Sequence, residues 1–232
     1  MPPQLDAITP LYSEDDVLRQ IEQAILSHKL MPGTKLKDVE LANLFGVKRG
    51  TIRKVLTKLA NTRLVSQQPN RGAVVAKPSV KEGRDLFATR RVIESAILKI
   101  LITLNNSDHI RKLRKILDNE QKAYQKEDRK RALDLSVDFH RKLAMMAGNS
   151  VMQDILEDII RRTPLVILTH LGPDSENSCR NQEHEAIVSA IECGNLKKAR
   201  RVMDEHLLHI ETQLHHKTEE PQPELAALLL SV

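Results

Sequence analysis

Residues 37–77 constrain the fold more than any other stretch of this 232-residue sequence. Apolar residues recur at helical spacing before Gly46 and again after Lys48, which predicts two helices joined by a tight turn, because glycine readily takes the left-handed conformation that ends a helix. Two short β-prone runs follow at residues 64–66 and 73–75, and the sequence Pro-Asn-Arg-Gly between them is typical of a hairpin turn. The stretch therefore predicts the order helix, turn, helix and two-stranded wing.

The same stretch is strongly basic. No Asp or Glu occurs between Leu41 and Val80, and the positively charged residues there are Lys48, Arg49, Arg53, Lys54, Lys58, Arg63, Arg71 and Lys77. Residues 1–78 contain 12 Lys and Arg against 7 Asp and Glu, so this third of the chain accounts for the whole net charge of +5. A lysine-rich surface helix alone decides little, but a basic helix in this order of elements favours double-stranded DNA as the ligand.

Outside this stretch the sequence predicts further helices. One covers residues 13–28 and begins at Ser13, which suits an N-cap, and six follow residue 78 with short breaks between them. These six segments are residues 80–104, 107–126, 128–146, 150–170, 174–193 and 195–217. Because short connections force consecutive helices to pack antiparallel, the predicted fold is mainly α: a winged helix-turn-helix over residues 1–78 and an all-α antiparallel bundle of six or seven helices over residues 79–232. Residues 218–232 fit either a tail or a short docking helix.

The composition excludes several classes of protein. Aromatic residues make up only 2% of the sequence, so the core must consist mainly of Leu, Ile, Val and Ala, and no sizeable sheet is expected. Cys179 and Cys193 are the only cysteines, which favours reduced thiols over a disulfide framework. No apolar run reaches the ~20 residues that span a bilayer, and the N-terminus lacks the pattern of a signal peptide, so a cytoplasmic protein with no membrane partner is expected.

Both halves of the sequence resemble one known family. The GntR transcriptional regulators carry a winged helix-turn-helix similar to LANLFGVKRGTIRKVLTKLANTRLV followed by NRGAVV. Their FadR-type C-terminal ligand-binding domain, called FCD, is similar to RRVIE at residues 90–94, FHRKLAMMAGN at 139–149 and HEAIVSAIECGNLKKARRVMDEHL at 184–207. The matching stretches cover most of residues 13–210, and their order is specific.

The resemblance implies which residues contact DNA. Arg49 and Arg53 are then the base-reading arginines, since arginine can donate two hydrogen bonds to guanine. The neighbouring contact positions that the resemblance implies are Lys48, Gly50 and Thr51 in the helix and Arg71 and Gly72 in the wing, and Lys54 is expected to lie outward beside them. Val39 stands where family members often carry an arginine, so one DNA contact is expected to be missing or moved to Lys37.

The resemblance also implies a metal site in the bundle. In many FCD domains three histidines and an Asp hold a metal that binds a small carboxylate effector, and the matching histidines are His140, His184 and His206. Sequence spacing alone does not show that they converge. Ser136 stands where the family carries the Asp, which weakens the expected retention of a divalent metal such as Zn²⁺ or Ni²⁺. A polar pocket that binds an organic anion directly, and core histidines without a ligand, stay open as alternatives.

Arg90 and Ser136 are the residues expected to contact the effector. The family carries an effector-facing arginine at the place of Arg90, and a buried guanidinium would pair well with a carboxylate. A structural ion pair with Glu94, one turn further on, is equally compatible with the spacing. Asp134 and Asp138 are poor substitutes for the missing Asp, because both point away from His140 on a 3.6-residue helix.

Together these features predict a ligand-responsive transcriptional regulator, not an enzyme. We expect a repressor that binds a palindromic operator as a homodimer, because one winged domain reads too few base pairs for useful specificity, and that responds to a small organic acid. One alternative is a metal-dependent hydrolase that uses the three histidines, although no HExxH motif and no well-placed base accompany them. The other is a regulator whose pocket no longer responds to any ligand.

Overall fold

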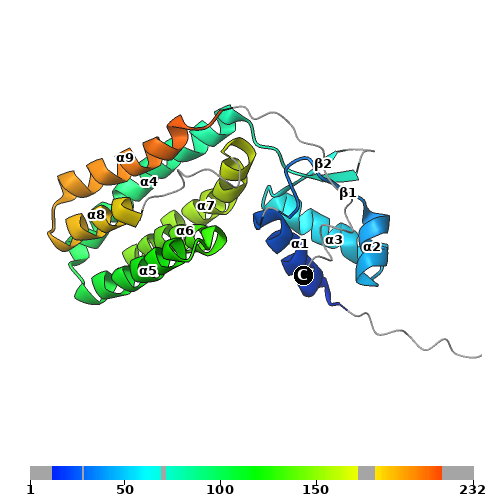
Figure 1. The fold of residues 1–232 in the computed structure, drawn as a ribbon, viewed down its shortest axis with the longest axis horizontal. Coiled ribbons are helices and arrows are strands. Elements are labelled where there is room, and N and C mark those ends of the chain that lie inside the picture. Colours follow the sequence, from blue (N-terminus) through cyan, green and yellow to red (C-terminus); the bar gives the residue numbers. More distant parts are fainter. Residues whose placement is uncertain (1–11, 28, 69–71, 172–180, 216–232) are drawn as a thin grey trace, which may run out of the picture. The chain divides into compact units, whose positions relative to one another are not determined.

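The structure is a computed structural model that describes residues 12–27, 29–68, 72–171 and 181–215. The chain divides into two compact units between Lys77 and Pro78, one residue away from the boundary expected from the sequence. Both units are built mainly of helices, with a small sheet in the N-terminal unit (Figure 1). Within the described ranges no helix is long and apolar enough to cross a membrane.

The N-terminal unit is a winged helix-turn-helix, as predicted. Its elements are α1 (Glu14–Leu26), β1 (Lys35–Leu36), α2 (Asp38–Phe45), α3 (Arg49–Asn61), β2 (Val65–Gln68) and β3 (Gly72–Val75). Ser13 caps α1, and Gly46 ends α2 with a φ of 62°, the left-handed conformation predicted for it. The helices bury their apolar faces against one another, and the residues that form this core include Val17, Ile21, Ile25, Leu41, Ile52, Val55 and Leu59.

The sheet has one strand more than the predicted two-stranded wing. Its strand order is β1-β3-β2 with antiparallel pairing, and in β1 Lys35 pairs with Val74 and Leu36 with Ala73. A two-residue strand is too short to show an alternating pattern, so only its pairing with β3 identifies it. The predicted hairpin turn over residues 69–71 lies outside the described ranges.

The C-terminal unit is an all-α bundle, which confirms the predicted fold class. Its described helices are α4 (Val80–Leu104), α5 (Ser107–Gln125), α6 (Arg129–Ala147), α7 (Ser150–His170), α8 (Asn181–Glu192) and α9 (Leu196–Thr212). The first four match their predicted ranges to within one residue. The predicted start of the fifth helix at residue 174 falls outside the described ranges, and the sixth ends at Thr212, several residues before its predicted end.

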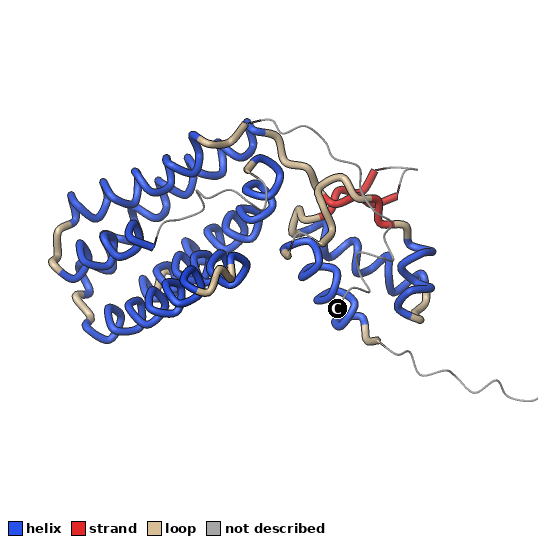
Figure 2. The backbone as a smooth tube through the Cα atoms, viewed as in Figure 1, coloured by secondary structure: helices blue, strands red, loops and turns tan. Residues whose placement is uncertain are grey.

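The helices of the bundle pack side by side (Figure 2), but among the described residues only some consecutive helices pair, and the neighbours include α6 with α7 and also the sequence-distant pair α5 with α8. α5 packs on α6, α8 on α9, and the long α4 lies against α6, α7 and α9. Phe87 of α4 and Phe139 of α6 are among the largest fully buried side chains. They belong to one core cluster that also holds Ile97, Leu98, Ile187 and Leu207. This core brings α6, α8 and α9 together around a group of buried polar residues.

Candidate DNA-binding surface and three-histidine site

α3 presents the predicted DNA-contacting residues on the side away from the core. Its buried residues are Ile52, Val55, Leu56 and Leu59. On the opposite side Arg49 and Arg53 expose 55% and 68% of their side chains. The other exposed residues of the predicted set here are Lys48, Gly50 and Lys54. Thr51 is half-buried, so it has less of its surface available for a ligand than the two arginines.

In the wing and at the start of α2 the structure describes Gly72, Val39 and Lys37 of the positions considered for DNA contacts. Gly72 opens β3 in an exposed position with a φ of 79°, whereas Arg71 lies outside the described residues. Val39, at the position where family members often carry an arginine, is a large apolar side chain that is 44% exposed. Lys37 pairs with Glu40 at 2.6 Å, so its ammonium group is engaged within α2.

Asp38, the first residue of α2, contacts both exposed arginines and was missed by the sequence analysis. Its Oδ2 lies 2.9 Å from Arg53 Nε and 3.1 Å from Arg49 Nη2. The hydrogen bond from Arg53, with the charges of both arginines, lowers the pKa of Asp38 although its partial burial acts the other way. No periodic signal marks this contact, since the carboxylate and the guanidiniums belong to different helices.

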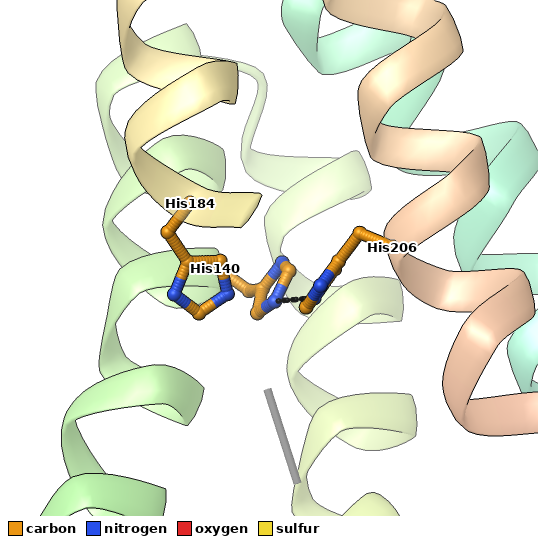
Figure 3. A group of neighbouring side chains, drawn as sticks. All are labelled: His140, His184 and His206. Carbon is orange, nitrogen blue, oxygen red and sulfur yellow. Dashed lines mark hydrogen bonds between the residues drawn. The ribbon is translucent and has the colours of Figure 1, made fainter. Parts of the chain in front are cut away.

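The three predicted histidines meet inside the bundle. His140 comes from α6, His184 from α8 and His206 from α9, and Figure 3 shows their rings turned toward one another. Each side chain offers a ring nitrogen, and these atoms all lie within 4.8 Å of one another. The residues are between 0% and 2% exposed, so the group is an interior site. The convergence that the sequence could not show is therefore present in the structure.

Each histidine is held by a carboxylate at its Nδ1 atom. The three pairs are His140 with Glu94 Oε2 at 2.5 Å, His184 with Glu120 Oε2 at 3.0 Å, and His206 with Glu183 Oε2 at 2.8 Å. Carboxylates in this position fix the ring orientation and the tautomer of metal-binding histidines in general, because they accept the Nδ1 proton and leave the Nε2 lone pair free to coordinate. All three rings thus have the arrangement of metal ligands.

Sequence signals for these carboxylates were uneven. The spacing of Glu94 predicts only an ion pair with Arg90, and Glu183 is marked by nothing more than its place directly before His184. Glu120 is fully buried within the apolar stripe of α5, between Leu117 and Ala123. A carboxylate in an apolar stripe is costly to bury without a partner, so its position was a usable signal that a polar site lies opposite.

Electrostatics keep His140 neutral and its partner ionised. Burial, reinforced by the charge of Arg90, lowers the pKa of His140 to about 3 although the Glu94 carboxylate acts against the shift. Burial would raise the pKa of Glu94, but Arg90 and His140 outweigh it and lower that pKa to about 2. In the same way, hydrogen bonds from two histidines of α9 lower the pKa of Glu183 to about 2 against the effect of burial.

The distances suit a bound cation. His140 Nε2 lies 3.3 Å from His206 Nε2, while the Nδ1 atom of each ring faces a carboxylate. The pair is a hydrogen bond only if one ring carries a proton on Nε2 (Figure 3), whereas in neutral rings with Nδ1 protonated the two Nε2 lone pairs face each other and repel. Two imidazole nitrogens on a tetrahedral zinc ion, with Zn–N bonds of ~2.0–2.1 Å, stand roughly 3.3–3.4 Å apart. The donor set therefore fits a divalent metal.

Ser136 and Arg90, the two residues expected to contact the effector, are both buried in the bundle. Ser136 is 2% exposed on α6, one turn before His140 and thus on the same face. Arg90 Nε pairs with Glu94 Oε1 at 2.7 Å, so the ion-pair alternative is present. Its Nη2 atom is nevertheless buried without a hydrogen-bond partner among the described residues. Asp134 is exposed, as expected for a residue that does not serve the site.

Two family models match the sequence. The model for bacterial regulatory proteins of the gntR family matches residues 13–75, and the FCD domain model matches residues 85–209, more than half of the chain. The chain belongs to the GntR family and carries an FCD domain. This GntR/FCD assignment confirms the predicted DNA-binding transcriptional regulator. The members of this family regulate transcription and are not enzymes. The assignment therefore also confirms the prediction that the chain is not an enzyme, and it rules against the hydrolase alternative.

Curated relatives and solved structures agree with the GntR/FCD assignment. The chain is 24% identical over 210 residues to the transcriptional repressor RspR of Escherichia coli K12, covering 89% of this chain and 90% of the relative. It is 26% identical over 218 residues to the repressor NanR of Cronobacter sakazakii, covering 82% and 81%. A GntR regulator from Rhodococcus sp. RHA1 shares the fold with a TM-score of 0.74 at 23% identity, over 86% of this chain and 96% of that one. The E. coli protein McbR also shares it, with a TM-score of 0.67 at 16% identity, over 84% and 91%.

Proposed function

We propose that this regulator is a repressor that binds a palindromic operator as a homodimer and is controlled by a small carboxylate effector in its C-terminal bundle. The relatives RspR and NanR, both named transcriptional repressors, support repression. The observation that carries the proposal is the buried cluster of three imidazoles, each held at Nδ1 by a carboxylate. Such an arrangement is costly in a core that has no ligand to bind, since each polar group must be desolvated.

Arg49 and Arg53 are proposed to read bases in the major groove. Both side chains are exposed on α3, and a guanidinium can donate two parallel hydrogen bonds to guanine. Lys48, Thr51 and Lys54 surround them and suit phosphate contacts, which set register without reading sequence. Because one unit makes few base contacts, two copies related by a two-fold axis are needed to recognise an operator.

A divalent metal, Zn²⁺ or Ni²⁺, is proposed to be held by the Nε2 atoms of His140, His184 and His206. Among the described residues, the buried carboxylates of Glu94 and Glu120 outnumber the buried guanidinium of Arg90, and a divalent cation would offset this excess of negative charge. When bound, such an ion offers open coordination positions to an anionic effector. Ser136 adds no charged ligand, so retention is expected to be weaker than with a carboxylate in its place.

The effector is proposed to be a small organic acid that contacts Arg90. The Nη2 atom of Arg90 is buried without a hydrogen-bond partner among the described residues, and a carboxylate would satisfy it. Arg90 and His140 share Glu94, which bonds to one with Oε1 and to the other with Oε2. An acid seated beside the histidines would therefore meet both the guanidinium and the metal position. The hydroxyl of Ser136 is proposed to face the same space.

The homodimer is proposed to form through α4 and α7. Val92, Val151 and Ile155 are large apolar side chains that are about half to three-quarters exposed, at 73%, 65% and 49%. Beside them an open groove of about 380 Å³ is lined by Ala96, Lys99, Ile100, Thr103, Leu104, Met152 and Arg200. A second copy is the occupant proposed for this apolar surface, because a palindromic operator requires a symmetric dimer.

Control by the effector is proposed to act through a population shift. An effector that binds the bundle better in one dimer geometry than in another increases the fraction of the first, and this changes the spacing of the two recognition helices. The size of the response is limited by the difference between the two affinities, so a tightly bound acid without such a difference would not regulate.

One experiment tests the proposed ligand site. The chelator-treated protein is titrated with Zn²⁺ and Ni²⁺ by calorimetry, and thermal melts are then recorded with sugar acids, dicarboxylates, hydroxy acids and amino acids. We expect metal binding that is lost in His184→Ala and an acid that raises the melting temperature only when Arg90 is intact. An acid that stabilises the protein equally without metal would instead support direct binding by the histidines.

Ser136 favours a second candidate function, a regulator that does not respond to an effector. A buried serine in place of a carboxylate leaves the site with fewer charged ligands, which suits a regulator that uses the bundle only to dimerise. A flat thermal response across the whole panel, with and without metal, would support this alternative over the proposed sensor. A separate gel shift with DNA from upstream of the gene tests DNA binding, which Arg49→Ala/Arg53→Ala is expected to abolish.

A further inference from the structure

Asp38 at the start of α2 holds the two exposed arginines of α3 through one carboxylate. Its Oδ2 lies 2.9 Å from Arg53 Nε, and its two oxygens lie 3.1 Å and 3.2 Å from Arg49 Nη2. The Asp38 side chain is only 24% exposed, whereas more than half of each arginine side chain is exposed. The carboxylate therefore lies on the protein side of the two guanidiniums and leaves their outer edges to solvent.

The bonds to Asp38 leave suitable donors for DNA. Arg53 donates from Nε, so its two terminal Nη groups can still form the parallel pair of hydrogen bonds that guanine accepts. Arg49 donates from Nη2 alone and keeps Nη1 and Nε. Long side chains on an exposed helix otherwise sample many rotamers, and orienting them before DNA arrives reduces the entropy that binding must remove.

The orientation of the arginines by Asp38 favours DNA binding, whereas the negative charge of Asp38 lowers the affinity for DNA. A carboxylate close to the DNA-facing side of α3 repels phosphates, and removing it would strengthen attraction to any duplex. The hydrogen bond from Arg53 and the neighbouring positive charges lower the pKa of Asp38, so the residue is ionised at neutral pH. Its effects on general affinity and on base selection are therefore separable by experiment.

We propose that Asp38 is a positioning residue for sequence recognition, which orients Arg49 and Arg53 toward the bases, raises discrimination between operator and random DNA, and lowers affinity for random DNA. The inference rests on the proposed base-reading role of the two arginines. It assigns a specificity function to an acidic side chain in a surface that otherwise attracts DNA through positive charge.

Glu40 provides a matched control on the same helix turn. Like Asp38 it is an acidic residue in the first turn of α2, and it is exposed. Its described ion pair is with Lys37 at 2.6 Å and not with an arginine of α3. Asp38→Asn and Glu40→Gln therefore remove the same charge from the same helix end, and they differ in whether Arg49 and Arg53 lose their partner.

The test is a binding-site selection from a random-sequence duplex pool, performed with the full-length protein. The comparison includes four proteins: wild type, Asp38→Asn, Glu40→Gln and Arg49→Ala/Arg53→Ala. For each protein the affinity for the selected duplex and the affinity for random duplex are measured at one salt concentration. We expect Glu40→Gln to select the wild-type motif. Asp38→Asn should lose preference at the positions that the double arginine variant also loses, and its specificity ratio should fall by roughly tenfold or more.

Three results would overturn the inference. Identical motifs for Asp38→Asn and Glu40→Gln would show that orientation by Asp38 is irrelevant to base selection. Loss of affinity for every duplex in Asp38→Asn would mark the residue as a determinant of the fold, because a positioning role predicts equal or stronger binding to random DNA. A wild-type motif from Arg49→Ala/Arg53→Ala would instead contradict the proposed base-reading role, and the inference that rests on it.

Discussion

Glu120 holds the His184 ring from α5 and is itself fully buried. Partners at this position typically change metal affinity about 10–100-fold when they are removed. We therefore expect Glu120→Gln, which keeps the shape and removes the charge, to weaken Zn²⁺ binding by that factor in a calorimetric titration. Glu185→Gln is the control, because Glu185 is exposed and pairs with Arg114. Equal affinities in the two variants would contradict a role of Glu120 in holding the ligand.

Ser136 can be converted into the carboxylate that the site lacks. Ser136→Asp places an unpaired charge at a position that is 2% exposed, so the chelated protein should lose ~1–3 kcal/mol of stability or more. Added Zn²⁺ should then raise the melting temperature more than it does in wild type, since the new carboxylate gains a cationic partner. The same substitution in a His206→Ala background is expected to show no such metal-dependent gain, and a persisting gain would refute the proposed ligand set.

At the scale of the element, Asp16 closes the capping box of α1. Its carboxylate accepts the Ser13 N–H at 3.1 Å, and the Ser13 Oγ accepts the Asp16 N–H at 3.1 Å. The hydrogen bond from the Ser13 side chain, with the backbone N–H of Ser13 and Arg19, lowers the pKa of Asp16. A carboxylate with a lowered folded-state pKa stabilises the fold above its unfolded pKa, and this contribution is lost as pH falls through the folded value.

Asp16→Asn should therefore reduce the free energy of unfolding at neutral pH, and the difference from wild type should shrink below about pH 4. Urea denaturation at a series of pH values measures the loss of stability at neutral pH and the decrease of this loss in acid. Asp15→Asn removes an exposed charge from the same turn and leaves the capping box intact, so its effect at neutral pH should be smaller. A difference between Asp16→Asn and wild type that persists unchanged in acid would show that the box does not act through the ionised carboxylate.

Gly83 lets α4 approach two neighbouring segments closely. A Cβ at this position would lie 2.8 Å from Val166 Cγ1 and 2.9 Å from Leu214 Cδ1. Overpacking costs ~1–3 kcal/mol and the helix propensity of alanine returns up to ~1 kcal/mol, so Gly83→Ala should destabilise the protein by about 1–2 kcal/mol. Gly50→Ala in α3 is the control, since its Cβ would meet no atom within 4 Å. Thermal melts in which Gly83→Ala is as stable as wild type would contradict the close packing.

The ends of helices could be predicted from the sequence where a single residue at the end determines the local backbone conformation. Ser13 and Gly46 mark helix ends through their own backbone hydrogen bonds and φ, so the helices around them were predicted within a residue or two. β1 was missed because Lys35 and Leu36 form a strand only by pairing with β3, from a part of the chain some forty residues later. β1 was not predicted because it has only two residues, and not because these residues have a low β-propensity.

At the scale of the whole molecule, the histidine site shows why a site is harder to predict than a fold. His184 and Glu120 are 64 residues apart in the sequence, and only the packing of α5 against α8 brings them together. Periodicity indicates which face of each helix is buried, but it does not indicate which buried residues meet. The family resemblance supplied the three histidines, whereas the carboxylates behind them depend on tertiary packing and were recognised from the structure.

The proposed homodimer can be tested at its apolar surface. Val92 of α4 and Ile155 of α7 are exposed apolar side chains of packed neighbouring helices, so charges there should oppose burial against a second copy. We expect Val92→Asp/Ile155→Asp to be monomeric by light scattering, with operator affinity reduced at least about a hundredfold because half of the base contacts are lost. Met145→Asp on α6 is the control, since this residue is 48% exposed but lies on another helix, and it should remain dimeric. A dimeric double variant would place the interface elsewhere, and a monomer with full operator affinity would contradict the requirement for two copies.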